Sequence, residues 1–255
     1  MNEGFKISKL EHDLLYINQN IEVYSNEEKR REYLKKIAYR IPETAIPQNH
    51  IEYLQEIRDK YIEKPNVIYD IGACVLHWTN ICKQFVWKDS STEYIVFDAF
   101  SDADFLYKEC NLRYNIDVLS DEINKEVKWF ENPIFPGGNS YFKENNELVF
   151  PSDEYKIKKC NTLTNVVKTK GFPLPDIIKI DVQGCEKDII LGGKEIIKEA
   201  KHLIVELQHA HYNEDAPLYS EVIPIIEDLG FKLEKPLFCN NGSDGDYHFV
   251  NSNKC

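Results

Sequence analysis

The chain has 255 residues, a formal net charge of −12, and hydrophobic and charged fractions of 42% and 29%. This length suits one large domain, and no apolar run approaches the ~20 residues that a membrane-spanning helix requires. The N-terminus lacks the long apolar stretch of a secretory signal, and the acidic balance excludes the broad basic surface that nucleic-acid binding requires.

The chain has seven cysteines, an odd number, and none of them belongs to a CxxC pair. This pattern indicates neither a disulfide framework nor a zinc site. Free thiols in this number suit a reducing compartment. We therefore expect a cytoplasmic protein with no membrane span and no nucleic-acid partner.

Residues 1–64 predict a helical extension ahead of an α/β domain over residues 65–255. The segment Ser25-Asn26-Glu27-Glu28 has the form of a capping box, and apolar residues follow it at helical spacing. A second helix is expected from Asn49 to Ile62, because Pro65 then prevents its continuation.

From residue 66 onward, short apolar runs alternate with helical stretches. The runs predict strands at 67–71, 94–97, 116–119, 177–180, 203–207, 231–233 and 247–250. Helices are expected near 78–88, 101–109, 162–170, 186–200 and 217–229. This alternation implies a mostly parallel sheet with helices on both faces, because strands buried on both faces read as continuous apolar runs.

The last two predicted strands have no helix between them. Their connection carries the turn-forming sequences Asn240-Asn241-Gly242 and Asp244-Gly245, which favour an antiparallel pair at one edge of the sheet. The predicted fold class is therefore α/β, with a seven-stranded, mostly parallel sheet whose final strand is antiparallel. Residues 120–160 predict an inserted β-hairpin flap.

The predicted strand at 67–71 leads into the most informative turn of the sequence. Asp70 lies near the strand's end, and Gly72 lets the backbone turn tightly into the next helix. A ligand at this edge meets unpaired amides of the helix, and Asp70 suits a cationic group such as the amino group of a methionine moiety. The fingerprint GxGxxG is absent, so no pyrophosphate cradle is indicated.

Two further acids follow neighbouring strands. Asp98 ends the strand at 94–97, where its carboxylate can accept both hydroxyls of a ribose, and Asp117-Val118 would lie at an adenine ring. Each acid alone is equally explained as a helix cap or turn residue, but the pair Asp70 and Asp98 favours an adenosyl ligand. The predicted cofactor contacts are Asp70, Gly72, Ala73, Cys74, Asp98, Ala99, Asp117 and Val118.

Four stretches of the domain form a pattern when they are read together. They are Tyr69-Asp70-Ile71-Gly72-Ala73; Phe97-Asp98; Leu119-Ser120-Asp121 with Glu126-Val127-Lys128-Trp129-Phe130; and Ile178-Lys179-Ile180-Asp181-Val182-Gln183-Gly184-Cys185-Glu186 with Leu203-Ile204-Val205-Glu206-Leu207. This pattern resembles the FkbM family of methyltransferases over residues 66–233. The fourth stretch is the most specific, because family members carry KIDVEGxE there.

The resemblance implies a Rossmann-like, class I methyltransferase fold, S-adenosylmethionine as cofactor and S-adenosylhomocysteine as product. It also implies O-methylation, commonly of sugars in surface polysaccharides, glycolipids or small secondary metabolites. The chain departs from the family pattern in three places. Asp98 and Gln183 stand where the family usually has Glu, and Cys74-Val75-Leu76 replaces Asn-x-Gly, so the cofactor loop lacks its second glycine.

Methyl transfer is an in-line displacement, so holding nucleophile, methyl and sulfur collinear supplies much of its rate. Lys179 and Asp181 share one face of the strand at 177–180, and Asp181 lies at its tip, beside the expected methyl position. We predict that they form a charged pair in the site, because buried charges are costly unless they are paired. A purely structural ion pair is the alternative.

The strand at 203–207 ends in a segment rich in candidate acceptor contacts, residues 206–211. Histidine changes its charge near neutral pH, so His209 is the predicted general base, favoured over His211 because it lies closer to the strand. Either histidine is alternatively a loop or capping residue. Glu206 is predicted to orient the base or to bind the acceptor, and His211 to bind the acceptor.

The segment 136–142 predicts one wall of the acceptor site. Its glycines give backbone mobility, and Asn139, Ser140 and Tyr141 can hydrogen-bond sugar hydroxyls, although a plain turn is the alternative. Asp181, Glu206 and the histidines are also possible ligands of a divalent metal. The Asp-Asn pair that such sites favour is absent after the following strand, so no metal is expected.

The leading hypothesis is an S-adenosylmethionine-dependent O-methyltransferase acting on a sugar or nucleotide-activated sugar in surface polysaccharide synthesis. Methylation of another small molecule at O or N is a second interpretation. A non-catalytic member that keeps the fold and binds a partner protein is a third. The N-terminal helices are compatible with a cap over the cofactor or with a homodimer.

Overall fold

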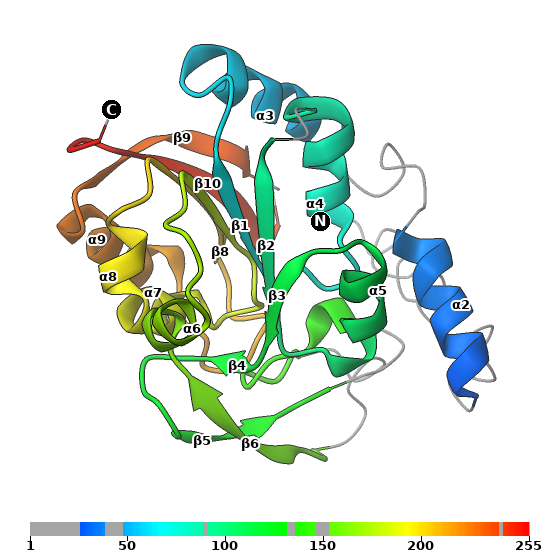
Figure 1. Cartoon of the computed structure of the whole chain (residues 1–255). Coiled ribbons are helices and arrows are strands. Elements are labelled where there is room, and N and C mark those ends of the chain that lie inside the picture. Colours follow the sequence, from blue (N-terminus) through cyan, green and yellow to red (C-terminus); the bar gives the residue numbers. More distant parts are fainter. Residues whose placement is uncertain are drawn as a thin grey trace, which may run out of the picture.

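The computed structural model describes residues 26–38, 48–88, 91–131, 136–145, 153–239 and 242–254. Its centre is a sheet with helices on both faces (Figure 1). The strands are β1 (Val67–Ile71), β2 (Glu93–Asp98), β3 (Arg113–Ile116), β7 (Ile177–Ile180), β8 (His202–Gln208), β9 (Phe231–Cys239) and β10 (Asp244–Asn251). Their order is β3-β2-β1-β7-β8-β10-β9, and β10 runs antiparallel to both neighbours. This confirms the predicted seven-stranded, Rossmann-like sheet with an antiparallel final strand.

The side chains of the strands alternate between two hydrophobic layers. Tyr69 and Val205 belong to the layer on one face, and Ile68 and Ile204 belong to the layer on the other. The first layer is covered by α6 (Leu163–Lys170), α7 (Glu186–Gly192), α8 (Lys194–Ile197) and α9 (Tyr219–Asp228). The second is covered by α3 (Gln48–Lys60), α4 (His77–Ile81) and the π-helix η2 (Cys82–Val86). Helix α5 (Asp104–Glu109) packs farther along the sheet (Figure 1).

Helix α3 is held to the sheet by a buried chain of polar rings. Tyr53 Oη lies 3.1 Å from Nδ1 of His248, and Nε2 of His248 lies 3.1 Å from Nδ1 of His202. Burial lowers the pKa of His202 to about 4 and the pKa of His248 to about 3. Both rings are therefore neutral near pH 7, so the hydrogen bonds form without a buried charge.

Helix α2 (Glu27–Ala38) packs beside the turn that follows β1. Its residues Leu34 and Ala38 are buried in one hydrophobic cluster with Ala73 and Leu76. The predicted capping box is wrong by one residue. The helix begins after Asn26, whose Oδ1 accepts hydrogen bonds from the amides of Glu28 and Lys29 at 2.9 and 3.3 Å, while Ser25 lies outside the described residues.

The predicted strand at 116–119 is divided between two sheets. Strand β3 ends at Ile116, and β4 (Val118–Leu119) turns away to join β6 (Lys156–Asn161). Strand β5 (Glu126–Trp129) pairs antiparallel with β6, so the second sheet has the order β4-β6-β5. This small sheet lies at the edge where the parallel strands end (Figure 1).

The predicted helix at 186–200 is also divided. Helix α7 ends at Gly192 and α8 begins at Lys194. A Cβ atom on Gly192 would lie 2.1 Å from the carbonyl oxygen of Ser120, so the chain of the second sheet passes too closely for a side chain. The close crossing of β4 over α7 therefore explains the break.

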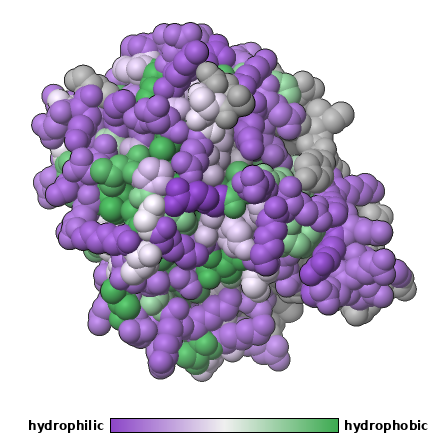
Figure 2. Space-filling view, in the orientation of Figure 1, coloured by the Kyte–Doolittle hydropathy of each residue, from purple (hydrophilic) through white to green (hydrophobic). Residues whose placement is uncertain are grey.

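The face of the molecule seen in Figure 2 is mainly hydrophilic, and its hydrophobic residues form separate patches. Among the described residues, every helix is too short or too polar to cross a bilayer.

Candidate active site

Two rows of residues cross the sheet at the carboxyl ends of its parallel strands, on the face covered by α3. Strand register places the first row side by side: Asp70, Lys179, Ile204 and His248. Two positions farther toward the edge, the second row consists of Gly72, Asp181, Glu206 and Asp246. Because side chains alternate along strands, both rows project toward the same face. The site is built on these rows.

Gly72 makes the turn after β1 possible. Its φ is +87°, and a Cβ atom would lie 1.8 Å from the carbonyl oxygen of Asp181. The amides of Gly72 and Ala73 both donate to the carbonyl oxygen of Phe97, at 2.9 and 3.2 Å. Backbone contacts with β2 and β7 thus fix the turn after β1, and only glycine fits at position 72.

The turn continues through two residues with positive φ, Cys74 at +44° and Leu76 at +68°. They stand where the resembling family has Asn and Gly, the residues that adopt this conformation with the least strain. Leu76 keeps the conformation because its side chain is buried, 1% exposed, in the cluster that contains Leu34 of α2. Burial of Leu76 thus supports a left-handed conformation at a position where the family pattern has glycine.

Asp70 is fully buried at the end of β1. Thr79 of α4 donates to its Oδ2 at 2.6 Å, and Nζ of Lys179 lies 3.8 Å from its Oδ1. Oδ1 has no hydrogen-bond donor among the described residues. Burial raises the pKa of Asp70, and the charge of Lys179 opposes this. Oδ1, which has an ion-pair partner but no hydrogen-bond donor, suits a cationic donor from a ligand.

Asp98 ties the turn to β2. Its Oδ2 accepts the amide of Cys74 at 2.6 Å, and its Oδ1 accepts the amide of Phe100 at 2.8 Å. Burial raises the pKa of Asp98, while these amides lower it. The amide of Ala99 also hydrogen-bonds this carboxylate. A carboxylate can accept about four hydrogen bonds, so capacity remains for a ribose hydroxyl.

The predicted adenine contacts lie beyond Asp98. Asp117 donates its amide to the carbonyl oxygen of Asp98 at 3.0 Å, and its Oδ2 accepts side-chain amides of Asn115 and Asn161 at 3.1 and 3.2 Å. Val118 is buried in a small cluster against which Ala99 also packs. The structure thus gathers these predicted contacts around the start of the second sheet.

Lys179 and Asp181 form the predicted pair. Lys179 Nζ donates to Asp181 Oδ2 at 2.7 Å, and the lysine is 5% exposed. Burial opposes the charge on Lys179, but the carboxylates of Asp181 and Asp70 raise its pKa overall. Burial likewise opposes the charge on Asp181, but Lys179 lowers its pKa. Both groups are therefore charged at neutral pH.

Gln183 joins two carboxylates of the second row. Its Nε2 donates to Asp181 Oδ1 at 3.3 Å and to Glu206 Oε2 at 3.0 Å, and its Oε1 accepts the hydroxyl of Tyr212 at 3.2 Å. Burial, and then the charges of Asp181 and Asp246, raise the pKa of Glu206 well above its usual range. Asp181 and Glu206 are therefore neighbours with opposite preferences for a proton.

Asp246 and His50 complete the cluster and were missed by the sequence analysis. Asp246 faces Glu206 across β8 and β10, and burial raises its pKa to about 7. His50 Nδ1 of α3 lies 3.4 Å from Asp246 Oδ2, and burial lowers the pKa of His50 to about 4. Asp246 directly follows an Asp-Gly pair that is typical of turns, so the sequence did not predict that Asp246 belongs to a strand. Nothing in the sequence placed α3 over this edge.

The loop after β7 is held by the remaining residues of its motif. Gln183 and Gly184 have φ of +57° and +98°, and a Cβ atom on Gly184 would lie 2.7 Å from Cβ of Ala216. Glu186 Oε1 accepts the amides of Val182 and Gly184 at 3.0 and 3.3 Å, and burial raises its pKa to about 7. The motif therefore fixes the loop that carries Gln183.

The structure does not bring the two predicted histidines into this cluster. His209 lies on the opposite face of β8, where its Nε2 is 2.8 Å from the hydroxyl of Tyr247 and its ring packs edge-on against Tyr219. His211 Nδ1 lies 3.0 Å from the carbonyl oxygen of Ala216. The alternation of side chains explains the separation, because Glu206 and His209 are an odd number of positions apart.

The predicted flap residues brace the site from outside. Ser140 is fully buried; its hydroxyl donates to the carbonyl oxygen of Gln183 at 2.8 Å and accepts the amide of Phe142 at 3.0 Å. Tyr141 donates to Asp188 Oδ2 at 2.9 Å. Asn139 donates its amide to the carbonyl oxygen of Pro136 at 3.2 Å. Ser140 therefore supports the loop of Gln183 and has no hydroxyl to offer an acceptor.

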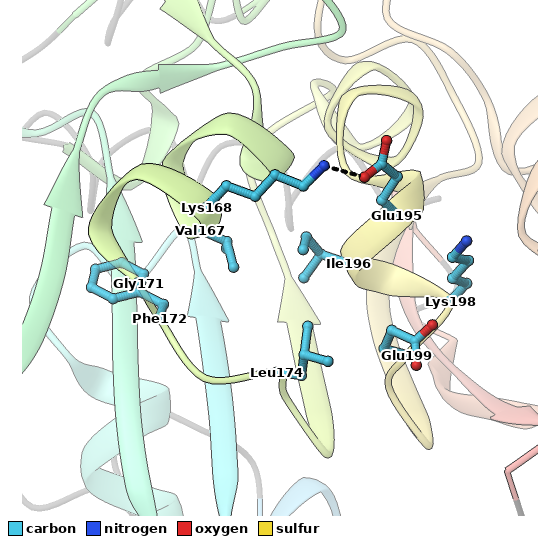
Figure 3. A pocket seen from close by; sticks show the side chains of 9 residues that line it. All are labelled: Val167, Lys168, Gly171, Phe172, Leu174, Glu195, Ile196, Lys198 and Glu199. Atoms are coloured by element: carbon cyan, nitrogen blue, oxygen red, sulfur yellow. Dashed lines mark hydrogen bonds and ion pairs between the residues drawn. The ribbon is translucent and has the colours of Figure 1, made fainter.

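A separate hollow lies at the opposite, amino end of the strands, between α6 and α8 (Figure 3). Its lining includes Val167, Leu174 and Ile196, and the ion pair of Lys168 and Glu195 crosses its mouth. It is remote from the carboxylate rows. Within the described parts of the chain, no group of three or more His, Cys, Asp or Glu residues is arranged to hold a metal ion.

Comparison with solved structures finds several methyltransferases with similar overall topology. OxaC in complex with SAH and oxaline matches over 90% of this chain with 8% identity and a TM-score of 0.43, and this chain spans 52% of OxaC. Magnesium protoporphyrin IX methyltransferase (ChlM) from Synechocystis PCC 6803 with bound SAM matches over 94% of this chain and 97% of its own, with 9% identity and a TM-score of 0.43. A putative hemolysin from Lactococcus lactis matches over 82% of this chain and 89% of its own, with 9% identity and a TM-score of 0.46.

These likenesses are too distant to carry a functional argument, and no curated protein sequence matches the chain. The comparison with protein families does support a functional conclusion. The model of the methyltransferase FkbM domain matches residues 70–233, from the buried carboxylate at the tip of β1 into β9, which is more than half of the chain. The matched segment contains the turn at Gly72, the Lys179–Asp181 pair and Glu206. The chain therefore belongs to the FkbM family of S-adenosylmethionine-dependent methyltransferases.

Proposed function

We propose that this enzyme methylates a hydroxyl oxygen of a sugar or nucleotide-activated sugar, in the synthesis of a surface polysaccharide. One observation carries the proposal: the row of Asp181, Glu206 and Asp246 gathers three carboxyl groups at the strand tips, and among the described residues Lys179 of the neighbouring row is the lysine that forms an ion pair with them. Carboxylates accept hydrogen bonds from hydroxyl groups, as carbohydrate recognition requires. Because Glu206 and Asp246 have raised pKa values, the row can donate as well as accept hydrogen bonds, which suits an uncharged polyol at the reacting position.

The residues present fit S-adenosylmethionine. Asp70 offers the cationic amino group a buried Oδ1 that has no hydrogen-bond donor, and Gly72 lets the chain turn sharply beside it, packed against the backbone of Asp181. Ala73 and Cys74 continue that turn, and Asp98 would hold the ribose. Ala99, Asp117 and Val118 would border the adenine. When bound, the cofactor supplies an electrophilic methyl group on a sulfonium centre.

The remaining predicted residues are proposed to orient the acceptor. Asp181, kept ionised by Lys179, would accept a hydrogen bond from an acceptor hydroxyl and face the sulfonium charge. Asn139 and His211 lie at the flap and at the loop after β8, where they would contact parts of the acceptor away from the methyl group. Tyr141 would stiffen this wall through its bond to Asp188.

Thermal unfolding with S-adenosylmethionine and S-adenosylhomocysteine tests cofactor binding, since a ligand that binds only the folded state raises stability by about 2.7 kcal/mol at a hundred times its Kd. Asp98→Asn should weaken that stabilisation, whereas Asp228→Asn at the exposed end of α9 should not. A screen of nucleotide-sugars and glycans with labelled methyl donor tests the acceptor. Transfer exclusively to acceptors without sugar hydroxyls would contradict the proposal.

A further inference from the structure

The two neighbouring carboxylates of the second row have unequal partners. Asp181 is paired with Lys179 at 2.7 Å. Glu206 instead receives a neutral amide from Gln183 at 3.0 Å and faces Asp246 across the strand pair. Among the described residues, no lysine, arginine or histidine lies within ion-pair distance of Glu206. One carboxylate is therefore neutralised by a cation, whereas the other has no cation beside it and can bind a proton.

We propose that Glu206 is the catalytic base that takes the proton of the acceptor hydroxyl, and that Gln183 is the residue that positions it. This inference rests on the proposed O-methyltransferase function. It replaces His209 in that role, because His209 lies on the other face of β8 and is engaged by Tyr247.

The order of residues along the row supports the assignment. Gly72, at the cofactor end, lies against the backbone of Asp181, and Asp181 is bridged to Glu206 through Gln183. The acceptor hydroxyl then meets Glu206 on the side away from the cofactor turn. Its proton passes to a carboxylate oxygen of Glu206 while its electron pair forms the bond to the methyl carbon. The sulfur keeps the electron pair of the bond that breaks.

A second observation indicates a ligand hydroxyl at this place. Gln208 follows Glu206 by two positions on the same face of β8 and is 2% exposed. Its Nε2 donates to Asn213 Oδ1 at 2.7 Å, but its Oε1 has no donor among the described residues. Buried acceptors are normally satisfied, so Oε1 of Gln208 is suited to receive a hydroxyl of a bound polyol.

The electrostatic setting of Glu206 agrees with this role. The charged and titratable groups that face it from the surrounding elements are Lys179, Asp181, Tyr212, Asp244, Asp246 and His50. Burial and the acids among these groups raise the pKa of Glu206, whereas Lys179 holds the pKa of Asp181 low. A base works best when its pKa approaches the working pH, and neighbouring carboxyls with divergent pKa values mark separate roles.

Gln183 determines this setting through its amide. Because Oε1 accepts the hydroxyl of Tyr212, both hydrogens of Nε2 point to carboxylates, and the orientation of the amide is fixed. A glutamate here, as in the family motif KIDVEGxE, would remove both donors and add a fourth carboxylate to the three of the row. Gln183 is thus a positioning residue that holds Glu206 beside Asp181 without further repulsion.

Titration calorimetry of S-adenosylmethionine and S-adenosylhomocysteine, in two buffers of different ionisation enthalpy, tests the assignment without an acceptor. The sulfonium cation should lower the pKa of a nearby carboxyl. The wild type should therefore release protons on binding S-adenosylmethionine that it does not release on binding S-adenosylhomocysteine. Glu206→Gln should lose this difference and keep its affinity for S-adenosylhomocysteine, while His209→Asn should keep the difference.

Two further variants test the environment of Glu206. Asp246→Asn removes a neighbouring negative charge, so the proton release should move to lower pH; Gln183→Glu adds one, so the release should move to higher pH. Thermal unfolding confirms that each variant is folded. Release that persists in Glu206→Gln, or disappears in His209→Asn, overturns the base assignment, and an unmoved midpoint in Gln183→Glu overturns the positioning role. Failure of the wild type to bind either ligand would instead refute the proposed function.

Discussion

Leu76 shows how a single buried side chain maintains a backbone conformation that its residue type disfavours. Its φ of +68° costs a non-glycine residue about 1–2 kcal/mol. The side chain is 1% exposed, and burial of a leucine of this kind contributes about 2–5 kcal/mol. Burial therefore outweighs strain, and Leu76 can hold this conformation where the family pattern has glycine.

Leu76→Gly should accordingly destabilise the protein although it removes the strain. We expect the free energy of unfolding to fall by up to about 4 kcal/mol, the difference between lost burial and relieved strain. Urea unfolding at neutral pH measures this. An increase in stability would show that the strain exceeds the packing energy.

Gly72→Ala should be more disruptive, because a Cβ atom at this position would lie 1.8 Å from the carbonyl oxygen of Asp181 and the backbone has a φ of +87°. We expect a loss of more than about 2 kcal/mol of stability and loss of stabilisation by S-adenosylhomocysteine. Gly137→Ala is the matched control, since no atom lies within 4 Å of a Cβ placed there. Equal melting temperatures for the two variants would contradict the close contact.

At the scale of elements, the loop between β7 and α7 combines support and chemistry. Glu186 begins α7 and accepts amides of Val182 and Gly184, so it shapes the turn that presents Gln183 to the carboxylates. Burial nevertheless raises its pKa from 4.5 to about 7. The folded protein therefore binds a proton on Glu186 that the unfolded chain releases near pH 4.5.

This raised pKa has a defined sign in stability. The contribution of Glu186 is fully present below about pH 4.5 and is lost as the pH rises through about 7. A difference of one pKa unit between the folded and unfolded states corresponds to about 1.4 kcal/mol, so the whole loss is about 3 kcal/mol. Glu186→Gln should remove this dependence, so its advantage over the wild type should grow from pH 5 to pH 8. Urea unfolding of both proteins across this pH range tests the prediction. If their free energies of unfolding change in parallel with pH, the raised pKa of Glu186 is contradicted.

The elements that sequence reasoning located are those whose signal is local. Strands β1 and β7 match their predicted bounds because their runs are apolar on both faces. The antiparallel β9 and β10 followed from turn sequences between two apolar runs. The division of the strand at 116–119 and the break at Gly192 depend on the crossing of β4 over α7, a contact between distant segments that leaves no local signal.

The same distinction applies to the site. The positions of Asp70, Asp98 and the Lys179–Asp181 pair could be anticipated from strand tips and alternation. The contributions of His50, Thr79 and Asp246 could not, because they depend on which helices cover the edge and on the register of an antiparallel strand. Residue roles beyond these placements remain predictions.

At the scale of the whole molecule, two sets of buried groups respond to pH in opposite directions. The pKa values of His50, His202 and His248 are lowered to about 4, 4 and 3, so their stabilising effect is present above pH 6.5 and is lost as the pH falls. The pKa values of Glu186 and Asp246 are raised to about 7, so theirs is lost as the pH rises. Between about pH 4.5 and 6.5 the two sets oppose each other.

The variant His248→Phe should show the pH dependence of the histidine contribution apart from that of the acids. The variant leaves Tyr53 and His202 without a shared partner, so we expect a cost of about 1–3 kcal/mol at pH 7. At pH 5 this cost should be smaller, because the wild type has begun to lose the contribution of the neutral ring. Unfolding measured at both pH values tests this, and a cost that stays constant would show that His248 does not titrate with folding.

Strand β10 contributes both to the carboxylate row at the edge of the sheet and to the attachment of helix α3. Asp246 and His248 lie two positions apart on one side of this strand, the first facing Glu206 and the second bonded to Tyr53 of α3. A slip of β10 by one residue would turn both toward α9 at once. Insertions or deletions in the hairpin between β9 and β10 should therefore be selected against for two reasons together, and the length of this hairpin should vary less than its composition.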